Sequence, residues 1–254
     1  MSPPDTTSAK TTADPDAALV FARFPDRFRA IVIGASGGIG GAIATALAVH
    51  PQCSAVARLS RSAIPVDGTP IDLLDEVSIA AAAASLAANA PYHLIVTAVG
   101  VLRGDGLEPE KSLRALDANM LARSFAINAI GPALVIKHFA PLLPKSGPCV
   151  LATLSAKVGS IGDNRLGGWY AYRASKAALN QLIRSSAVEI ARTRPDARVL
   201  ALHPGTVATK FSDGYNPSHE VFTPADAARR LLAVMAASDG SGQFLSHDGT
   251  EIPW

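Results

Sequence analysis

Short apolar runs that alternate with helical stretches constrain the fold of this chain more than any other feature. Five runs are nearly uninterrupted and have the length of strands: residues 29–33, 55–59, 92–97, 148–153 and 199–203. Helices are expected between and after them, at about residues 39–49, 79–90, 109–130, 133–142 and 172–193. Strands that are apolar throughout are buried on both faces, and strands that alternate with helices pair in parallel. The sequence therefore predicts an α/β fold with a doubly wound parallel sheet and helices on both faces.

The body of the chain contains no Pro- or Gly-rich linker, and its composition is that of an ordinary globular protein. Hydrophobic residues make up 48% of the 254 residues and charged residues 17%. Residues 1–27 differ, because they are rich in Pro, Thr, Ala and Asp. We predict a flexible N-terminal tail over 1–27, in which residues 17–24 could form a short helix or lie on the domain surface, and a single domain over 28–254.

Charge and cysteine content exclude several classes of partner. The net charge is +2 and Lys and Arg form no long run, which argues against nucleic acid or an anionic membrane surface. No uninterrupted apolar run approaches the roughly 20 residues that span a bilayer. The two cysteines, Cys53 and Cys149, lack the spacing of a metal site or a disulfide scaffold. We expect no metal, no membrane partner and a reducing, cytoplasmic location.

A glycine turn follows the first predicted strand directly and opens the first predicted helix. The sequence is Gly34-Ala-Ser-Gly-Gly-Ile-Gly40, and the order of strand, turn and helix is the context of a Rossmann-type dinucleotide site. Glycine lets the backbone approach a pyrophosphate, and the helix N-terminus directs its N–H groups at that phosphate. A tight strand–helix connection without a ligand is the alternative. The candidate cofactor residues here are Gly34, Ser36, Gly37, Gly38, Ile39 and Gly40.

The end of the second predicted strand indicates which dinucleotide is bound. It reads Arg58-Leu-Ser60-Arg61, where an acidic residue would bind the free 2′-hydroxyl of NAD. Arg61 and Ser60 are suited to a 2′-phosphate, so NADP(H) is preferred and NAD(H) remains possible. Solvated surface arginines are the alternative.

Two further segments are expected to contact the adenosine part of the cofactor. Asp72 and Leu73 precede a helix, and the Asp72 carboxylate is expected to accept from the adenine amino group. Asp72 could instead be a simple helix N-terminal residue, although Asp75 could also serve there. Ala98 and Gly100 end the strand over 92–97, where small residues leave room for the ribose.

Tyr172 and Lys176 are the candidates for proton transfer. They are four residues apart, so they share one face of a helix. A tyrosine has a pKa of about 10, and a neighbouring ammonium favours the phenolate and lowers that pKa. Tyr170 lacks such a partner, because Ala174 lies four residues after it. Taken alone, the pair is also consistent with two unrelated helix residues.

Together these motifs resemble those of the short-chain dehydrogenase/reductases, over essentially all of residues 29–254. Within that family the chain looks most like the C-factor-like and carbonyl-reductase-like branch, on segments 159–169 and 248–254. The motifs that carry the family resemblance are Gly34–Gly40, Asp72-Leu73, Asn128-Ala-Ile-Gly131, Ser155, Tyr172-x-x-x-Lys176 and Pro204-Gly-Thr-Val-Ala-Thr209.

The resemblance implies a role for each matching residue. Tyr172 is the general acid in reduction and the base in oxidation, and Lys176 lowers its pKa and binds the nicotinamide ribose. Ser155 polarises the substrate carbonyl, and Asn128 holds a water that links Lys176 to solvent. The residues that border the nicotinamide carboxamide and the pyrophosphate are Pro204, Gly205, Val207 and Thr209.

Two strand ends depart from the family pattern. The segment Leu154-Ser155-Ala156 offers one serine where the family usually has two, unless Ser160 contributes. The segment Thr97–Gly100 lacks the usual asparagine, so other groups must supply its hydrogen bonds.

The resemblance implies an NADP(H)-dependent enzyme that reduces the carbonyl of a small aldehyde or ketone, and reversibly oxidises the alcohol. An NAD-dependent alcohol dehydrogenase is one alternative, and a C-factor-like signalling or regulatory protein with little turnover is another. The substrate pocket is expected along residues 102–106, 157–169 and 210–222. Family members commonly pair through two long helices, so a homodimer or homotetramer is possible.

Overall fold

Parallel strands form the central sheet of the chain in the computed structural model, which describes residues 21–61, 68–104, 106–209, 211 and 220–254. The strand order is β3-β2-β1-β4-β5-β6-β9. The order reverses between β1 and β4, at the point where ligands bind in doubly wound sheets. The strands of this sheet are β1 (Phe28–Ile33), β2 (Cys53–Ser60), β3 (Gly68–Pro70), β4 (Leu94–Thr97), β5 (Cys149–Leu154), β6 (Ala197–His203) and β9 (Gln243–Ser246). A separate two-stranded parallel sheet pairs β7 (Thr206–Val207) with β8 (Val221–Phe222).

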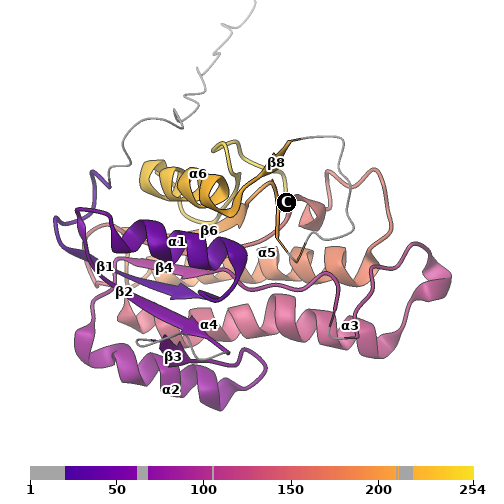
Figure 1. Ribbon diagram of the computed structural model, residues 1–254, viewed down its shortest axis with the longest axis horizontal. Coiled ribbons are helices and arrows are strands. Elements are labelled where there is room, and N and C mark those ends of the chain that lie inside the picture. The colour runs from indigo at the N-terminus through magenta and orange to yellow at the C-terminus, as the bar shows by residue number, and fades with distance from the viewer. Residues whose placement is uncertain (1–20, 62–67, 105, 210, 212–219) are drawn as a thin grey trace, which may run out of the picture.

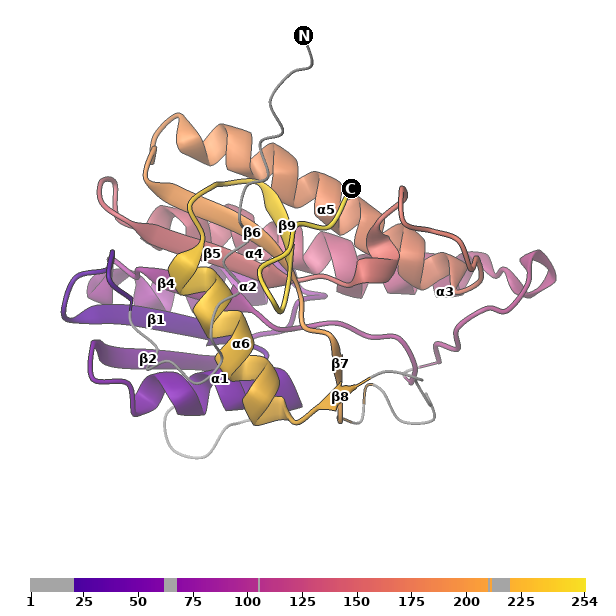
Figure 2. The same ribbon diagram turned by 90° about the horizontal axis from the view of Figure 1, so that it is seen from above.

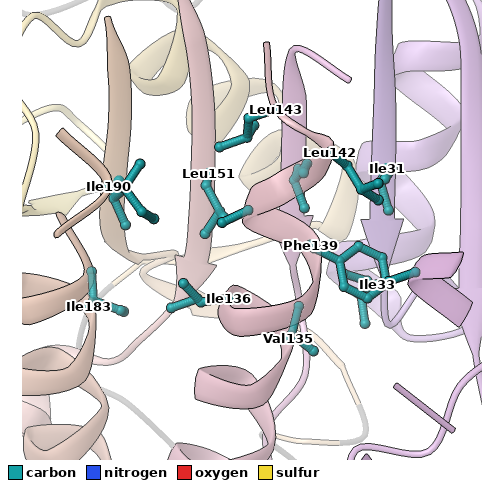
Figure 3. Close-up of a cluster of buried hydrophobic side chains, with 14 of the residues drawn as sticks. Ile31, Ile33, Val135, Ile136, Phe139, Leu142, Leu143, Leu151, Ile183 and Ile190 are labelled. Atoms are coloured by element: carbon teal, nitrogen blue, oxygen red, sulfur yellow. The ribbon is translucent and has the colours of Figure 1, made fainter. Parts of the chain in front are cut away.

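Helices cover both faces of the sheet, as predicted (Figures 1 and 2). One face carries α1 (Gly38–Ala48) and α6 (Pro224–Ala237), and the other carries α2 (Glu76–Leu86), α4 (Gly131–Phe139) and α5 (Tyr170–Ala191). Alternate residues of β1 serve the two cores, because successive side chains of a strand point to opposite faces. Ile31 and Ile33 pack against Phe139 on the α4 side (Figure 3), whereas Ala30 and Val32 pack with α1 and α6.

The helical region before β5 differs from its prediction. Helices were predicted over 109–130 and 133–142, but α3 covers Ala118–Phe125 and continues through a π-helical turn, Ala126–Ile130, into α4. The later start follows from Asp117, whose side chain accepts from the N–H groups of Asn119 and Met120 and so caps the helix. Pro132 lies inside the continuous helical run, as the second residue after the π turn.

The run Ala118–Leu142 is long and apolar enough to cross a bilayer by length and composition. Half of its apolar window is buried inside the protein, and Val135, Ile136 and Phe139 face the sheet (Figure 3). We therefore interpret it as a core helix.

The prediction missed three elements of the sheet and its cover: β3, α6 and β9. A signal for α6 was present. Thr223 caps the helix by accepting from the Asp226 N–H, and Pro224 is the first helical residue. Buried residues then recur at Ala227, Ala228, Leu231 and Leu232. The strands β3 and β9 lie at the two edges of the sheet and are three and four residues long. Such short edge strands carry little periodic signal.

Part of the predicted tail belongs to the packed body. Phe21 and Phe24 are buried and their rings stack on each other, and both rings contact Phe28 of β1, one tilted and one edge-on. The N–H group of Phe21 also donates to the Gln52 side chain at 3.0 Å. Among the described residues, packing therefore begins at Phe21, ahead of the boundary predicted at residue 28. The rest of the predicted tail, residues 1–20, lies outside the described residues.

Candidate active site and cofactor groove

The glycine turn joins β1 to α1 and has no room for a side chain at Gly34. Gly34 has φ +87°, and a Cβ on it would lie 2.5 Å from the Ala98 carbonyl oxygen, so only glycine fits there. The N-cap of α1 is Gly37, and no side chain caps that helix. Ser36, Gly37 and Gly38 are exposed. The uncapped N–H groups of α1 are thus available to an anion.

A groove of about 260 Å³ opens beside this turn, where β1 and β4 adjoin. It fits a dinucleotide because it combines exposed backbone N–H groups, small residues and polar strand ends. Nine of the predicted cofactor residues line it: Gly34, Ser36, Gly37, Ser60, Arg61, Asp72, Leu73, Ala98 and Gly100.

The other predicted cofactor residues of the glycine turn and of segment 204–209 do not line the groove. Ile39 of α1 packs on a small cluster that includes Val207. A Cβ on Gly38 would lie 2.6 Å from the Thr209 methyl group, so the segment that follows β7 adjoins the glycine turn. Gly40 approaches the Gly34 carbonyl, and Gly205, which follows Pro204 after β6, approaches the rings of Phe222 and His247.

Asp72 and Asp75 divide the roles that the sequence left open. The Asp75 side chain accepts from the Val77 N–H at 2.9 Å and caps α2. Asp72 accepts from the Leu74 N–H at 3.0 Å and lines the groove. Helix capping therefore falls to Asp75.

Ser60 and Arg61 lie at the end of β2, on the rim of the groove. Ser60 is buried and Arg61 is exposed. Arg58 lies earlier in the strand, and its guanidinium approaches the Ala44 carbonyl of α1 at 3.5 Å. Of the two arginines, Arg61 faces the groove.

Helix α5 presents Tyr172 and Lys176 on its buried face. The Lys176 ammonium donates to the Leu154 carbonyl at 2.9 Å, at the end of β5. A Cβ on Gly100 would lie 3.4 Å from Lys176 Nζ and 3.3 Å from Asn128 Oδ1. Because Gly100 has no side chain, the segment after β4 can lie close to both Lys176 and Asn128.

Burial, and not the neighbouring ammonium, dominates the ionisation of this pair. It raises the pKa of the Tyr172 hydroxyl and lowers the pKa of Lys176 to about 7. The sequence predicted a lowered pKa for Tyr172. The direction is opposite because Lys176 binds a backbone carbonyl while both side chains lose solvation.

Asn128 joins the π turn to the end of β4. Its amide exchanges two hydrogen bonds of 2.8 Å with the backbone of Val101 and also donates to Ser124 and Ser175. Ser175 in turn donates to the Tyr172 carbonyl. Asn128 thus supplies hydrogen bonds to the strand end that lacks the family's asparagine.

Ser155 follows β5 and is buried. Its hydroxyl donates to the side-chain carbonyl of Asn180 at 2.6 Å. The sequence reasoning missed Asn180, although its place four residues after Lys176 puts it on the same helix face.

The start of α5 depends on a second residue that the sequence reasoning missed, Glu110. Its buried carboxylate accepts from the Ala171 N–H at 3.2 Å, and its carbonyl accepts from the Trp169 N–H at 2.6 Å. Trp169 has φ +51°, a strained conformation for a bulky side chain. Glu110 thereby holds the turn that precedes Tyr172.

Two aromatic rings flank Tyr172. The Trp169 ring lies 6.5 Å from it and the Phe211 ring 5.9 Å, measured between centroids. Both come from segments expected to line the substrate pocket, 157–169 and 210–222. Residues 105, 210 and 212–219 of the expected pocket lie outside the described residues.

Comparison with known proteins places this geometry in a family. Residues 29–220 match the short chain dehydrogenase family. The 1-hydroxy-2-glutathionyl-2-methyl-3-butene dehydrogenase of Rhodococcus sp. (strain AD45) is 31% identical over 239 residues, covering 88% of this chain and 98% of that protein. C-signal of Myxococcus xanthus is 38% identical over 146 residues, covering 56% and 84%.

A solved structure has the same fold. The NADPH-bound carbonyl reductase from chicken fatty liver superimposes with a TM-score of 0.78 at 24% identity, covering 91% of this chain and 96% of that one. These relatives confirm the predicted resemblance to the C-factor-like and carbonyl-reductase-like branch. The chain therefore belongs to the short-chain dehydrogenase family and is an oxidoreductase.

Proposed function

We propose that the protein is an NADP(H)-dependent reductase of a small aldehyde or ketone, which also oxidises the corresponding alcohol. One observation carries the proposal: α5 brings Tyr172 and Lys176 to the end of β5, where Ser155 follows, and to Asn128 of the π turn, beside the groove.

The groove residues would hold the cofactor in two places. The N–H groups at the start of α1 would bind the pyrophosphate, and Ser60 with Arg61 would bind the 2′-phosphate. When bound, the reduced cofactor supplies a hydride to the carbonyl carbon. The NADPH bound by the chicken carbonyl reductase supports this choice of dinucleotide.

The side chains near Tyr172 handle the proton and the developing charge. Ser155 donates a hydrogen bond to the substrate oxygen, and Tyr172 gives that oxygen its proton. Lys176 holds positive charge close by, which favours proton loss from Tyr172. Because burial alone raises the pKa of Tyr172, this help from Lys176 depends on its being protonated.

Tyr172→Phe tests the proposal, since it removes the proton and keeps the ring. We expect kcat for NADPH-dependent reduction of a panel of reactive aldehydes and ketones to fall by about 100-fold or more. NADPH binding, measured by fluorescence titration, should survive.

Tyr170→Phe is the matched control, because it makes the same change two residues earlier on the same helix. It should retain near wild-type turnover. If the Tyr172→Phe variant keeps most of its turnover rate, Tyr172 is not the proton donor and the proposal fails at its central step.

The C-signal relative favours a second candidate, a cofactor-binding signalling protein with little turnover. Tight NADPH binding with no turnover on a broad carbonyl panel would support it. Tighter binding of NAD than NADP would instead favour an NAD-dependent alcohol dehydrogenase.

We also propose that the enzyme works in the cytoplasm as a homodimer or homotetramer. Ile130 and Val188 support an assembly through the helices around α3 and α5, because both apolar side chains are exposed there. Light scattering measures the mass that tests this.

A further inference from the structure

Asn180 shares the buried face of α5 with Tyr172 and Lys176 at successive intervals of four residues. Asn180 is 3% exposed. Its side-chain oxygen accepts a hydrogen bond from the Ser155 hydroxyl, with 2.6 Å between the two oxygens. A serine hydroxyl has a single proton to donate. While Ser155 donates to Asn180, it has no proton to offer a substrate carbonyl.

The amide nitrogen of Asn180 has no hydrogen-bond partner among the described residues, and it is buried. A buried donor without a partner costs free energy, so its presence in a folded protein requires an explanation. Here the unused donor belongs to the side chain that binds the proposed carbonyl-polarising serine.

A half turn of the amide would exchange the roles of its two ends. The nitrogen would then donate to the Ser155 oxygen, which can accept while its own proton points elsewhere. The Ser155 proton would become free for the substrate oxygen. A hydroxyl that accepts a hydrogen bond is also polarised into a stronger donor.

We infer that Asn180 is a positioning residue that holds Ser155 through its carbonyl and, by turning its amide, releases the Ser155 proton to the substrate. The inference rests on the proposed function, since it needs Ser155 to bind the substrate oxygen. It also accounts for the single serine after β5, where the family usually has two. The second polar group near Ser155 is the Asn180 amide, which comes from α5.

A double-mutant cycle with Ser155→Ala and Asn180→Leu tests the inference, with turnover measured on the best carbonyl of the panel. Leucine is close to asparagine in size and offers no hydrogen bond. We expect Asn180→Leu to lower kcat by about 10-fold or more, with a much smaller change in KM. Because both residues act through one hydroxyl, the double variant should be no slower than Ser155→Ala alone.

Two further variants separate positioning from folding. Asn180→Gln keeps an amide and should recover part of kcat. Gln181→Leu makes a matched change at the next, exposed residue of α5, and its kcat should equal that of the wild type. If Asn180→Leu fails to fold, Asn180→Gln and Asn180→Ser complete the cycle with Ser155→Ala.

The outcomes distinguish this inference from the proposed function. Independent losses that multiply in the double variant, or an unchanged kcat in Asn180→Leu, would overturn the inference while Ser155→Ala and Tyr172→Phe still uphold the proposed function. Full activity of Ser155→Ala would remove the role of Ser155 from the proposed function, and the role of Asn180 with it.

Discussion

At the scale of single residues, burial decides the chemistry of the candidate site. Tyr172, Lys176, Ser155 and Asn128 each lie below a tenth exposure. In the described part of the chain, the hydrogen bonds of Asn128, Ser155 and Lys176 go to backbone carbonyls, an amide and hydroxyls. In such a setting desolvation sets the pKa directions, and a few hydrogen bonds set the orientations.

Lys176 should make stability depend on pH in a defined direction. Its pKa is about 7 in the folded chain and about 10.4 when unfolded. Between these values the unfolded chain binds more protons, so the folded state gains stability as pH rises. Relative to Lys176→Met, the free energy of unfolding of the wild type should increase by about 2 kcal/mol from pH 7 to pH 9.

Urea denaturation of both proteins at several pH values measures this difference. Subtracting the Lys176→Met curve removes the contribution of the other titrating groups. Parallel pH curves for the two proteins would contradict the assignment of a lowered pKa to Lys176.

At the scale of elements, α5 is the part on which the site depends. Its 22 residues carry Tyr172, Lys176 and Asn180 toward the sheet, and its first turn has no side-chain cap from its own N-cap residue. Glu110, 61 residues earlier, supplies the capping oxygens. The sequence near α5 could not predict this cap, because the capping residue comes from another loop.

Removing that cap should weaken both the fold and the reaction. Glu110→Ala should lower the free energy of unfolding by about 1–2 kcal/mol, since it leaves a helix N–H group buried and unpaired. It should also lower kcat, because the strained turn at Trp169 loses part of its support.

Glu110→Gln is the control, because it keeps an acceptor oxygen at the same place. It should lose less stability than Glu110→Ala, and the remaining loss reports the interaction of the charge with the helix dipole. Equal stability of Glu110→Ala and the wild type in urea would show that the cap is dispensable.

At the scale of the whole molecule, cofactor binding should be visible as thermal stabilisation of the fold. NADPH at about 100 times its Kd should raise the melting temperature by about 5–10 °C. NADH at the same concentration should raise it less. Arg61→Ala should reduce the NADPH shift to the NADH value, because it removes the predicted partner of the 2′-phosphate.

Differential scanning fluorimetry measures these shifts. Arg123→Ala, an exposed arginine on α3, is the matched control and should keep the full NADPH shift. An Arg61→Ala protein that still prefers NADPH by the wild-type margin would contradict the proposed role of Arg61.

The sequence by itself predicted the five central strands of the sheet, the glycine turn and the helix face shared by Tyr172 and Lys176, because these follow from local patterns. Apolar runs mark the buried strands, and Gly34 marks the turn that follows the end of β1. Tyr172 and Lys176 share a face through helix periodicity alone. Family resemblance then named Asn128 and Ser155, which no local pattern singles out.

Only the tertiary structure decided which groups the site residues bind. Asn180 meets Ser155 because α5 packs across the end of β5, and Glu110 meets Ala171 across 61 residues. Burial likewise reversed the expected pKa direction of Tyr172. Helix and strand periods describe neighbours within one element, whereas desolvation and long-range hydrogen bonds depend on which elements pack together.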